Sequence, residues 1–266
     1  MFNLSPSSAS RFLLSLALVA TLSACAGDKN KDAMAPDEAV ESLYNKGTDA
    51  LNSGDFKEAT KQFAEVERQH PYSQWATRAQ LMEAYANYLN LDYDAAIKAL
   101  DQFIELHPGN KDAAYAYYLR ALSNYERISD VHRDQTAAKE SQKGFQEVIN
   151  RFPDSEYAKD AVLKITLIND HLAGAEMEVG RYYLKQHLYI SAIGRFKTVI
   201  DKYQTTSHVP EALERLVETY LALGLVDEAK KHAAVLGYNF PGSDWYQDAY
   251  SLMRDHGVNM DAKKKK

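Results

Sequence analysis

The sequence predicts an all-α solenoid built from five helix-hairpin repeats. Apolar residues recur at helical spacing, and no stretch of the chain reads as a β-strand. Small residues, large apolar residues and a terminating proline return in the same order along the chain, with prolines at Pro71, Pro108, Pro153 and Pro241. Five copies in register indicate hairpins that stack on one another to bury a continuous core.

The stretch from Gly47 to Pro71 shows the repeat unit most clearly. Gly47 and Ala59 are small enough for two antiparallel helices to approach closely, and Phe63 fills the space between them. Gly54 accepts the backbone conformation of a helix end, and Pro71 stops the second helix. Small, small, phenylalanine and proline in this order are typical of the tetratricopeptide repeat, which is about 34 residues long.

Four later hairpins repeat the pattern. Their second helices carry the two positions that Ala59 and Phe63 hold in the first copy, at Ala96 and Leu100, Ser141 and Phe145, Ala192 and Phe196, and Ala229 and Ala233. In the fourth copy Gln204 replaces the proline. Polar residues that follow the hairpins suit the N-caps of the next helices, at Ser73, Asn110, Ser155, Thr206 or Ser207, and Ser243.

Departures from the repeat length define the organisation of the chain. Ser155–Lys185 is periodic and free of proline, so it predicts one long linking helix, and Ser243–Met253 predicts a C-terminal capping helix. An insertion at Ile128–Ala137 separates the helices of the third repeat, with Asp134 as the expected N-cap. We therefore expect an N-terminal module of repeats 1 to 3 at residues 38–154. A second module, at residues 155–256, would hold the long helix, repeats 4 and 5 and the cap. A basic tail would follow at residues 257–266.

The first 24 residues have the composition of a lipoprotein signal peptide. Arg11 precedes the apolar run Phe12–Leu22, which is too short to span a hydrocarbon layer about 30 Å thick. The run ends in Leu-Ser-Ala-Cys, which resembles a lipobox with Cys25 as the lipidated residue. An ordinary secretory signal with a chance cysteine is the alternative, although Cys25 is the only cysteine in the chain.

The residues after the predicted cleavage site indicate a protein that is anchored to a membrane by lipid. Diacylglycerol and acyl chains such as palmitate on Cys25 would exceed the two lipid signals that stable anchoring needs. Ala26, in place of the aspartate associated with inner-membrane retention, favours the outer membrane. Residues 25–37 are small, charged and aperiodic, so we expect them to form a flexible lipidated tether.

Composition and charge exclude several classes of function. The chain has 45% apolar residues and a net charge of −6, and this acidic balance argues against a nucleic-acid partner. The eight histidines show no zinc-ligand spacing, and no glycine-rich loop follows a strand. The sequence therefore predicts neither an enzyme nor a metal or cofactor site.

Tyrosine is unusually abundant, with 18 tyrosines against 9 phenylalanines. In repeats of this kind, set positions of the first helix face an inner groove, where a tyrosine offers an apolar ring and a polar tip to an extended peptide. The predicted groove residues are Tyr44, Arg78, Leu81, Tyr85, Tyr88, Tyr115, Tyr118 and Tyr125. The alternative is that about half of these side chains only pack between helices.

Three longer stretches, together with the lipobox and the five repeats, resemble one family. They are AYYLRALSNYERISDVHRDQ (Ala116–Gln135), DHLAGAEMEVGRYYL (Asp170–Leu184) and RFKTVIDKYQTTSHVPEALERLVETYLALGL (Arg195–Leu225). The chain is similar along almost its whole length to the BamD family, also called ComL or YfiO. This is a family of lipoproteins of the outer-membrane β-barrel assembly machinery.

The resemblance implies a non-enzymatic, lipid-anchored scaffold that faces the periplasm and takes part in protein insertion into the outer membrane. The N-terminal repeats would receive unfolded outer-membrane proteins through their aromatic-ended C-terminal strand. The C-terminal repeats would dock on a periplasmic POTRA domain of BamA, with Arg195 as the expected contact, and other lipoproteins of the complex would be further partners. A lipid-anchored adaptor for peptidoglycan or pilus assembly is the rival reading, but it would not share the Asp170–Leu184 motif.

Overall fold

The computed structural model describes residues 38–258, and every regular element in this range is an α-helix. The all-α prediction is therefore confirmed for the described part of the chain. The predicted signal peptide, the tether, the lipidated Cys25 and residues 259–266 of the predicted tail lie outside it.

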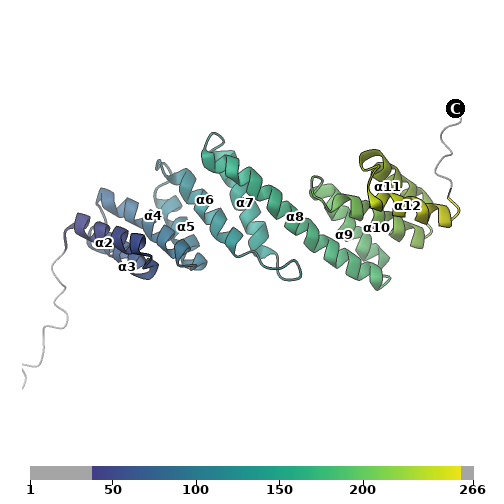
Figure 1. Ribbon diagram of the computed structural model, residues 1–266. Helices are drawn as coiled ribbons and strands as arrows, with labels where there is room; N and C mark the ends of the chain where they lie inside the picture. Colours follow the sequence, from purple (N-terminus) through teal and green to yellow (C-terminus); the bar gives the residue numbers. More distant parts are fainter. Residues whose placement is uncertain (1–37, 259–266) are drawn as a thin grey trace, which may run out of the picture. The chain divides into compact units, whose positions relative to one another are not determined.

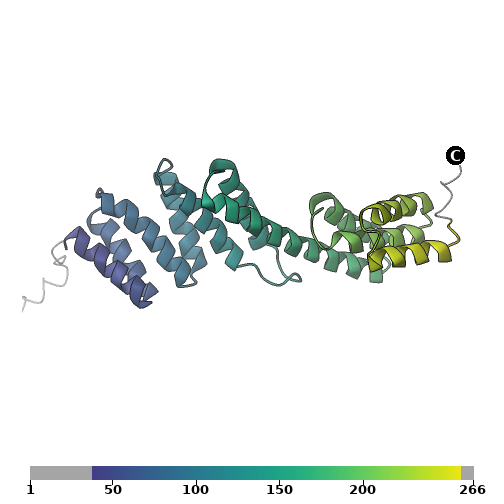
Figure 2. The same cartoon turned by 45° about the horizontal axis from the view of Figure 1, so that its top comes forward.

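Within Val40–Val258 the helices form hairpins in chain order. Three hairpins come first, α2 (Val40–Ser53) with α3 (Phe56–Gln69), α4 (Gln74–Leu89) with α5 (Tyr93–Leu106), and α6 (Ala113–Glu126) with α7 (Thr136–Arg151). The long helix α8 (Glu156–Lys185) pairs with α9 (Tyr189–Lys202), and α10 (Val209–Ala222) and α11 (Val226–Asn239) are followed by α12 (Asp244–Asp255). Figures 1 and 2 show each helix lying beside its neighbours in the sequence.

The residues that define the repeats are buried as predicted. The residues at the positions of Ala59 and Phe63 are at most 1% exposed in all five second helices. A Cβ atom placed on Gly47 would lie 2.7 Å from the Phe63 ring, and one on Gly180 would lie 2.5 Å from the Phe196 ring. These distances are too short for real contacts, so only glycine fits opposite each phenylalanine.

Three of the expected helix caps are present. The Oγ atoms of Ser73, Ser155 and Ser243 accept hydrogen bonds of 3.1, 3.1 and 3.2 Å from backbone N–H groups in the first turns of α4, α8 and α12. Each serine satisfies one of the donors that a helix start leaves without a backbone partner. The starts of these helices are therefore encoded locally.

The caps expected before α6 and α7 are wrong. The side chain of Asn110 accepts from the backbone N–H of Asp112, which holds the N-cap position of α6 without a side-chain bond. Asp134 accepts from the N–H of Thr136, but the N-cap of α7 is Gln135. In both places the polar side chain accepts a hydrogen bond from the backbone N–H two residues further on. This bond closes a turn directly before the helix and takes the place of a cap.

The cap expected before α10 is also wrong, because the candidate residues bond elsewhere. The hydroxyl of Ser207 donates to Asp170 of α8 at 3.0 Å, and that of Thr206 donates to the Tyr203 carbonyl at 2.8 Å. Pro210 lies in the first turn and has no N–H group to satisfy. A contact between elements therefore replaces the local cap.

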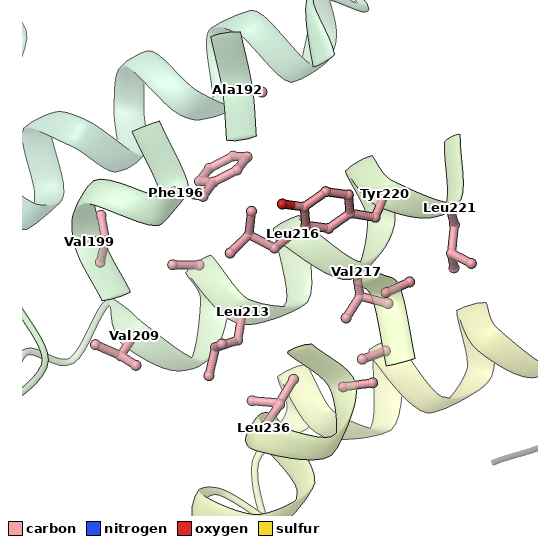
Figure 3. Close-up of a cluster of buried hydrophobic side chains, with 14 of the residues drawn as sticks. Ala192, Phe196, Val199, Val209, Leu213, Leu216, Val217, Tyr220, Leu221 and Leu236 are labelled. Atoms are coloured by element: carbon pink, nitrogen blue, oxygen red, sulfur yellow. The ribbon is translucent and has the colours of Figure 1, made fainter. Parts of the chain in front are cut away.

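The predicted long helix is confirmed, and it belongs to two cores. Its part up to Leu172 packs Ala161, Ile168 and Leu172 with Phe145 of α7. Its second half packs Ala173 and Met177 into a cluster with α9 to α12. Figure 3 shows this second core, where Phe196, Leu216 and Leu236 come together from α9, α10 and α11.

The middle of α8 forms hydrogen bonds with two loops, the one before α7 and the one before α10. His171 Nε2 lies 2.7 Å from Oε1 of Gln135 in the loop before α7, and Asp170 binds the loop before α10. Gly174 lies between them, since a Cβ there would be 3.2 Å from His208 and 3.7 Å from Val131. The Asp170–Leu184 motif thus begins with the residues that join both loops to the long helix.

Candidate functional site

Four tyrosines from three helices form a continuous set of ring contacts, which we call the tyrosine row. Ring centroids are 6.4 Å apart between Tyr85 and Tyr115, 5.6 Å between Tyr115 and Tyr157, and 5.2 Å between Tyr157 and Tyr118. The row joins α4, α6 and α8, and its side chains are half-buried. Such rings present apolar surface at a small cost in side-chain entropy.

The hydroxyl groups of this region are neutral donors. Tyr118 donates to Oδ2 of Asp160 on α8 at 2.7 Å, and Tyr88 donates to Glu126 at 3.4 Å. Burial raises the pKa of Tyr88 to about 12, with a smaller effect from the Glu126 carboxylate, and burial likewise raises the pKa of Tyr115 and Tyr118. The surface therefore combines apolar rings with un-ionised hydroxyls, which suits a peptide better than a proton-transfer reaction.

A cation lies over an aromatic ring on either side of the tyrosine row in the sequence. The Arg78 guanidinium lies 6.0 Å from the centre of the Trp75 ring, which itself packs on Tyr44. The Lys164 ammonium lies 4.5 Å from the centre of the Tyr125 ring. These cation–π contacts attach charged groups of α4 and α8 to the aromatic surface.

The structure places the eight predicted groove residues in different environments. Tyr85, Tyr115 and Tyr118 meet in the tyrosine row, whereas Tyr44, Tyr88 and Tyr125 contact other aromatic rings, and Arg78 is exposed. Leu81 is only 9% exposed and belongs to a core cluster with Leu100 and Leu119. Peptide binding by this set remains a prediction.

Two aromatic residues of the site were not predicted from the sequence, although a short motif marks them. Trp75 and Tyr157 each stand two residues after a capping serine and four after a proline, in PYSQW and PDSEY. The same spacing recurs in PGSDW, which ends at Trp245, and there Arg215 lies 5.6 Å from the ring centre. The motif places an aromatic ring in the first turn of α4, α8 and α12.

Arg195, the residue expected to contact a partner, already has a partner within the chain. Its Nη1 donates to Oε2 of Glu176 on α8 at 3.0 Å, and this hydrogen bond raises the pKa of Arg195. The side chain is 43% exposed, so the pair stands at the surface of the α8–α9 hairpin. Contact with a partner protein remains a prediction.

A charged network follows on α10. Arg181 of α8 pairs with Glu211 at 2.9 Å, and Arg215 pairs with Glu218 at 2.8 Å. Glu214 is buried beside Arg215, and burial raises its pKa to about 7 against the opposing effect of that arginine. The Arg181–Glu211 pair joins α8 to α10, whereas the Arg215–Glu218 pair lies within α10.

The described part of the chain shows neither a metal site nor a membrane span. No cluster of three or more His, Cys, Asp or Glu residues between residues 38 and 258 could hold a metal ion. In the same range no helix combines the length and apolar character needed to cross a bilayer.

The fold and the site define a class, the tetratricopeptide-type repeat proteins with an aromatic surface on their first helices. The particular family follows from comparison with known proteins. The model of the YfiO family, described as "Outer membrane lipoprotein", matches residues 36–236, and the chain belongs to this family.

Relatives with assigned names agree with the family match. The chain is 52% identical to a Caulobacter vibrioides protein, over 91% of this chain and 79% of the relative. It is 49% identical to a Rickettsia prowazekii protein, over 92% and 96% of the two chains. Both relatives are named "Outer membrane protein assembly factor BamD". Among solved structures, the TPR2AB domain of yeast Sti1 in a pHSP90 complex is 12% identical, with a TM-score of 0.46 over 81% of this chain and 83% of that one.

Proposed function

We propose that this protein is a lipid-anchored scaffold subunit of the machinery that inserts β-barrel proteins into the outer membrane. The observation that carries the proposal is the similarity, over nine-tenths of the chain, to proteins named outer membrane protein assembly factors. Lipid on Cys25 holds the protein at the outer membrane, and the repeats face the periplasm. The subunit binds and positions other proteins and performs no reaction itself.

The tyrosine row binds the C-terminal strand of unfolded outer-membrane proteins. Its support is physical: half-buried rings on three helices offer apolar contacts, and neutral hydroxyls offer hydrogen bonds to an extended backbone. Aromatic side chains of a strand fit such rings in tilted or edge-on contacts.

The C-terminal repeats bind a periplasmic POTRA domain of the barrel subunit BamA. Arg195 supports this assignment because its guanidinium is partly exposed and is held in place by Glu176. A guanidinium oriented in this way can accept a second carboxylate from a partner at little further cost in side-chain entropy.

The two binding activities should be separable, and paired variants test this. Replacing Tyr85 and Tyr88 together with Ala should weaken a peptide that ends in an aromatic residue by about 1–3 kcal/mol and leave docking intact. Arg195→Glu should abolish docking and leave the peptide bound, since the new carboxylate repels its partners. Fluorescence anisotropy measures the peptide, and a pull-down of the periplasmic domains of BamA measures docking.

Matched variants control for folding. Tyr238→Ala removes an exposed tyrosine of α11 and should change neither activity. Glu176→Gln removes the internal partner of Arg195 without reversing a charge, so it separates loss of the internal pair from loss of docking. If the Tyr85 and Tyr88 double variant lost docking but still bound the peptide, the tyrosines would form the docking site. The functions assigned to the two surfaces would then have to be reversed.

A further inference from the structure

The first half of α8 carries leucines on the side opposite its core. Leu163 is 65% exposed and Leu167 is 56% exposed, while Ala161 and Ile168 on the other side are fully buried. A helix that covers one core is ordinarily polar on its outer side, and one that is apolar on both sides is built to be covered on both. Within residues 38–258 neither leucine belongs to a core cluster, and more than half of each stays open to solvent.

The repeat geometry explains why they are left open. Leu163 and Leu167 hold the places after Ser155 that Leu81 and Tyr85 hold after Ser73. Leu81 lies in a core cluster with residues of α5 and α6, the elements that follow α4. On α8 the core of the helices that follow begins at Ala173. Before it, among the described residues that follow α8, only Tyr203 and the loop before α10 reach the helix, on the side of Ile168 and at Asp170. The open leucines therefore occupy a place where a further layer would pack.

Two neighbours of these leucines connect them to tyrosines of α6, one in the tyrosine row and one outside it. Asp160 accepts the hydrogen bond from Tyr118, and Lys164 lies over the ring of Tyr125. One helix turn of α8 thus carries two open leucines and, between them in the sequence, Lys164, whose ammonium group lies over a tyrosine ring of α6. No carboxylate in the described residues forms an ion pair with Lys164, in contrast to Arg120 of α6 and Arg127, the residue that follows this helix.

We propose that Leu163, Lys164 and Leu167 form the subsite for the carboxyl end of the bound peptide. Lys164 pairs with the terminal carboxylate, the last aromatic side chain rests on the two leucines, and the preceding residues follow the tyrosine row. The inference rests on the proposed peptide-binding function and adds to it the direction of the peptide and the group that reads its free end.

The opposite direction, with the carboxylate on Arg78, is less well supported. Arg78 also lies over an aromatic ring, but α4 has no exposed large apolar side chain that could receive the terminal residue. Its nearest aliphatic counterpart, Leu81, is buried. An ammonium next to open apolar surface complements a peptide end that is both charged and aromatic, and only α8 offers this combination among the helices of the aromatic surface.

Anisotropy with two labelled peptides tests the subsite on the full-length protein. Both peptides end in phenylalanine, one with a free carboxylate and one with a terminal amide. The wild-type protein should prefer the free acid by about tenfold, the range expected for one charge-assisted contact. Lys164→Gln should remove this preference and leave affinity for the amide unchanged, and Lys164→Arg should restore it. Replacing Leu163 and Leu167 together with Asn should weaken both peptides by about tenfold.

Controls separate the subsite from the proposed function itself. Leu106→Asn on α5 changes a leucine that is also 56% exposed, and it should leave both affinities unchanged with the same melting temperature. If Arg78→Gln, and not Lys164→Gln, removed the preference for the free acid, the peptide would lie in the opposite direction and the inference would be overturned. If the variant with Asn at both leucines bound both peptides as the wild type does, while Tyr85→Ala and Tyr88→Ala lost binding, the subsite would be overturned. The proposed peptide-binding function would stand. Absence of binding to the wild type would overturn the function.

Discussion

At the scale of single residues, two kinds of aromatic side chain have different tasks. Phe196 is fully buried between α9 and its neighbours, opposite Gly180. Tyr85 keeps part of its ring at the surface, next to Tyr115. The first kind holds helices together, and the second leaves part of its ring open to solvent, so the two should differ in their effect on stability.

Phe196→Ala should therefore destabilise the protein much more than Tyr85→Ala. Removing a fully buried phenylalanine costs about 3–5 kcal/mol, because contacts are lost and a cavity remains. The half-buried tyrosine should cost less than half of that. Urea unfolding of both variants measures the difference, and equal losses would mean that Tyr85 is a core residue.

Glu83 of α4 predicts a pH dependence of stability. Burial raises the pKa of its carboxyl from its ordinary value of 4.5 to about 7, and the Glu67 carboxylate adds to the effect. Between these two values the folded state binds more protons than the unfolded state, so stability falls as the pH rises from about 4.5 to about 7 and then levels off.

Glu83→Gln cannot ionise and should flatten this part of the profile, with a gain in stability above pH 7 and little change at pH 4.5. Unfolding at several pH values measures it. Glu140→Gln, at an exposed site on α7, is the matched control. A profile that is unchanged in Glu83→Gln would show that the carboxyl is ionised in the folded protein at neutral pH.

At the scale of elements, α8 decides most of the architecture. One uninterrupted helix supplies residues to two cores, and its middle residues bind the loops before α7 and α10. Its second half pairs with α9 through the close contact of Gly180 with Phe196. The pairing of these two helices therefore depends on the absence of a side chain at one position.

Gly180→Ala should destabilise the α8–α9 hairpin by about 1–3 kcal/mol, the range for overpacking a core. Gly194→Ala on α9 is the matched control, because a Cβ there meets no atom within 4 Å. That change should stabilise the protein by about 0.5–1 kcal/mol, since glycine is a poor helix former. Thermal melts distinguish the two, and a neutral Gly180→Ala would mean that the phenylalanine ring can move aside.

At the scale of the whole molecule, stability comes from packing between neighbouring hairpins. The helices of residues 40–258 contact mainly their neighbours in the sequence, as in other repeat proteins. The chain has a single cysteine, so no disulfide can form within it. Lipidation of that cysteine would then govern location and leave the fold of the repeats unchanged.

Cys25→Ser should accordingly leave the melting temperature unchanged and remove the protein from the membrane fraction. The reason is that acyl chains supply the membrane affinity. Mass spectrometry of the wild type detects the lipid, and fractionation is performed in cells that lack the partner proteins. Retention of the variant in the outer membrane, together with a wild type free of lipid, would refute the lipoprotein assignment.

The sequence alone determined the features that depend on neighbouring residues. Helical periodicity and the recurring small and aromatic positions predicted the hairpins, and the absence of proline between Ser155 and Lys185 predicted α8. The caps at Ser73, Ser155 and Ser243 follow from one serine and the next few backbone amides. The caps that failed are those where a local turn or a contact from another helix took up the polar group.

Only the tertiary structure decided which side chains meet and which stay open. Tyr157 joins Tyr115 and Tyr118 across two helices, and Arg195 pairs with Glu176. The motif PDSEY marks a ring at Tyr157, but the local sequence does not say which side chains these residues meet. Leu163 is open because the helices that follow pack on the other half of α8. Local periodicity sets which face of a helix is apolar, but the relative placement of whole helices sets what covers that face.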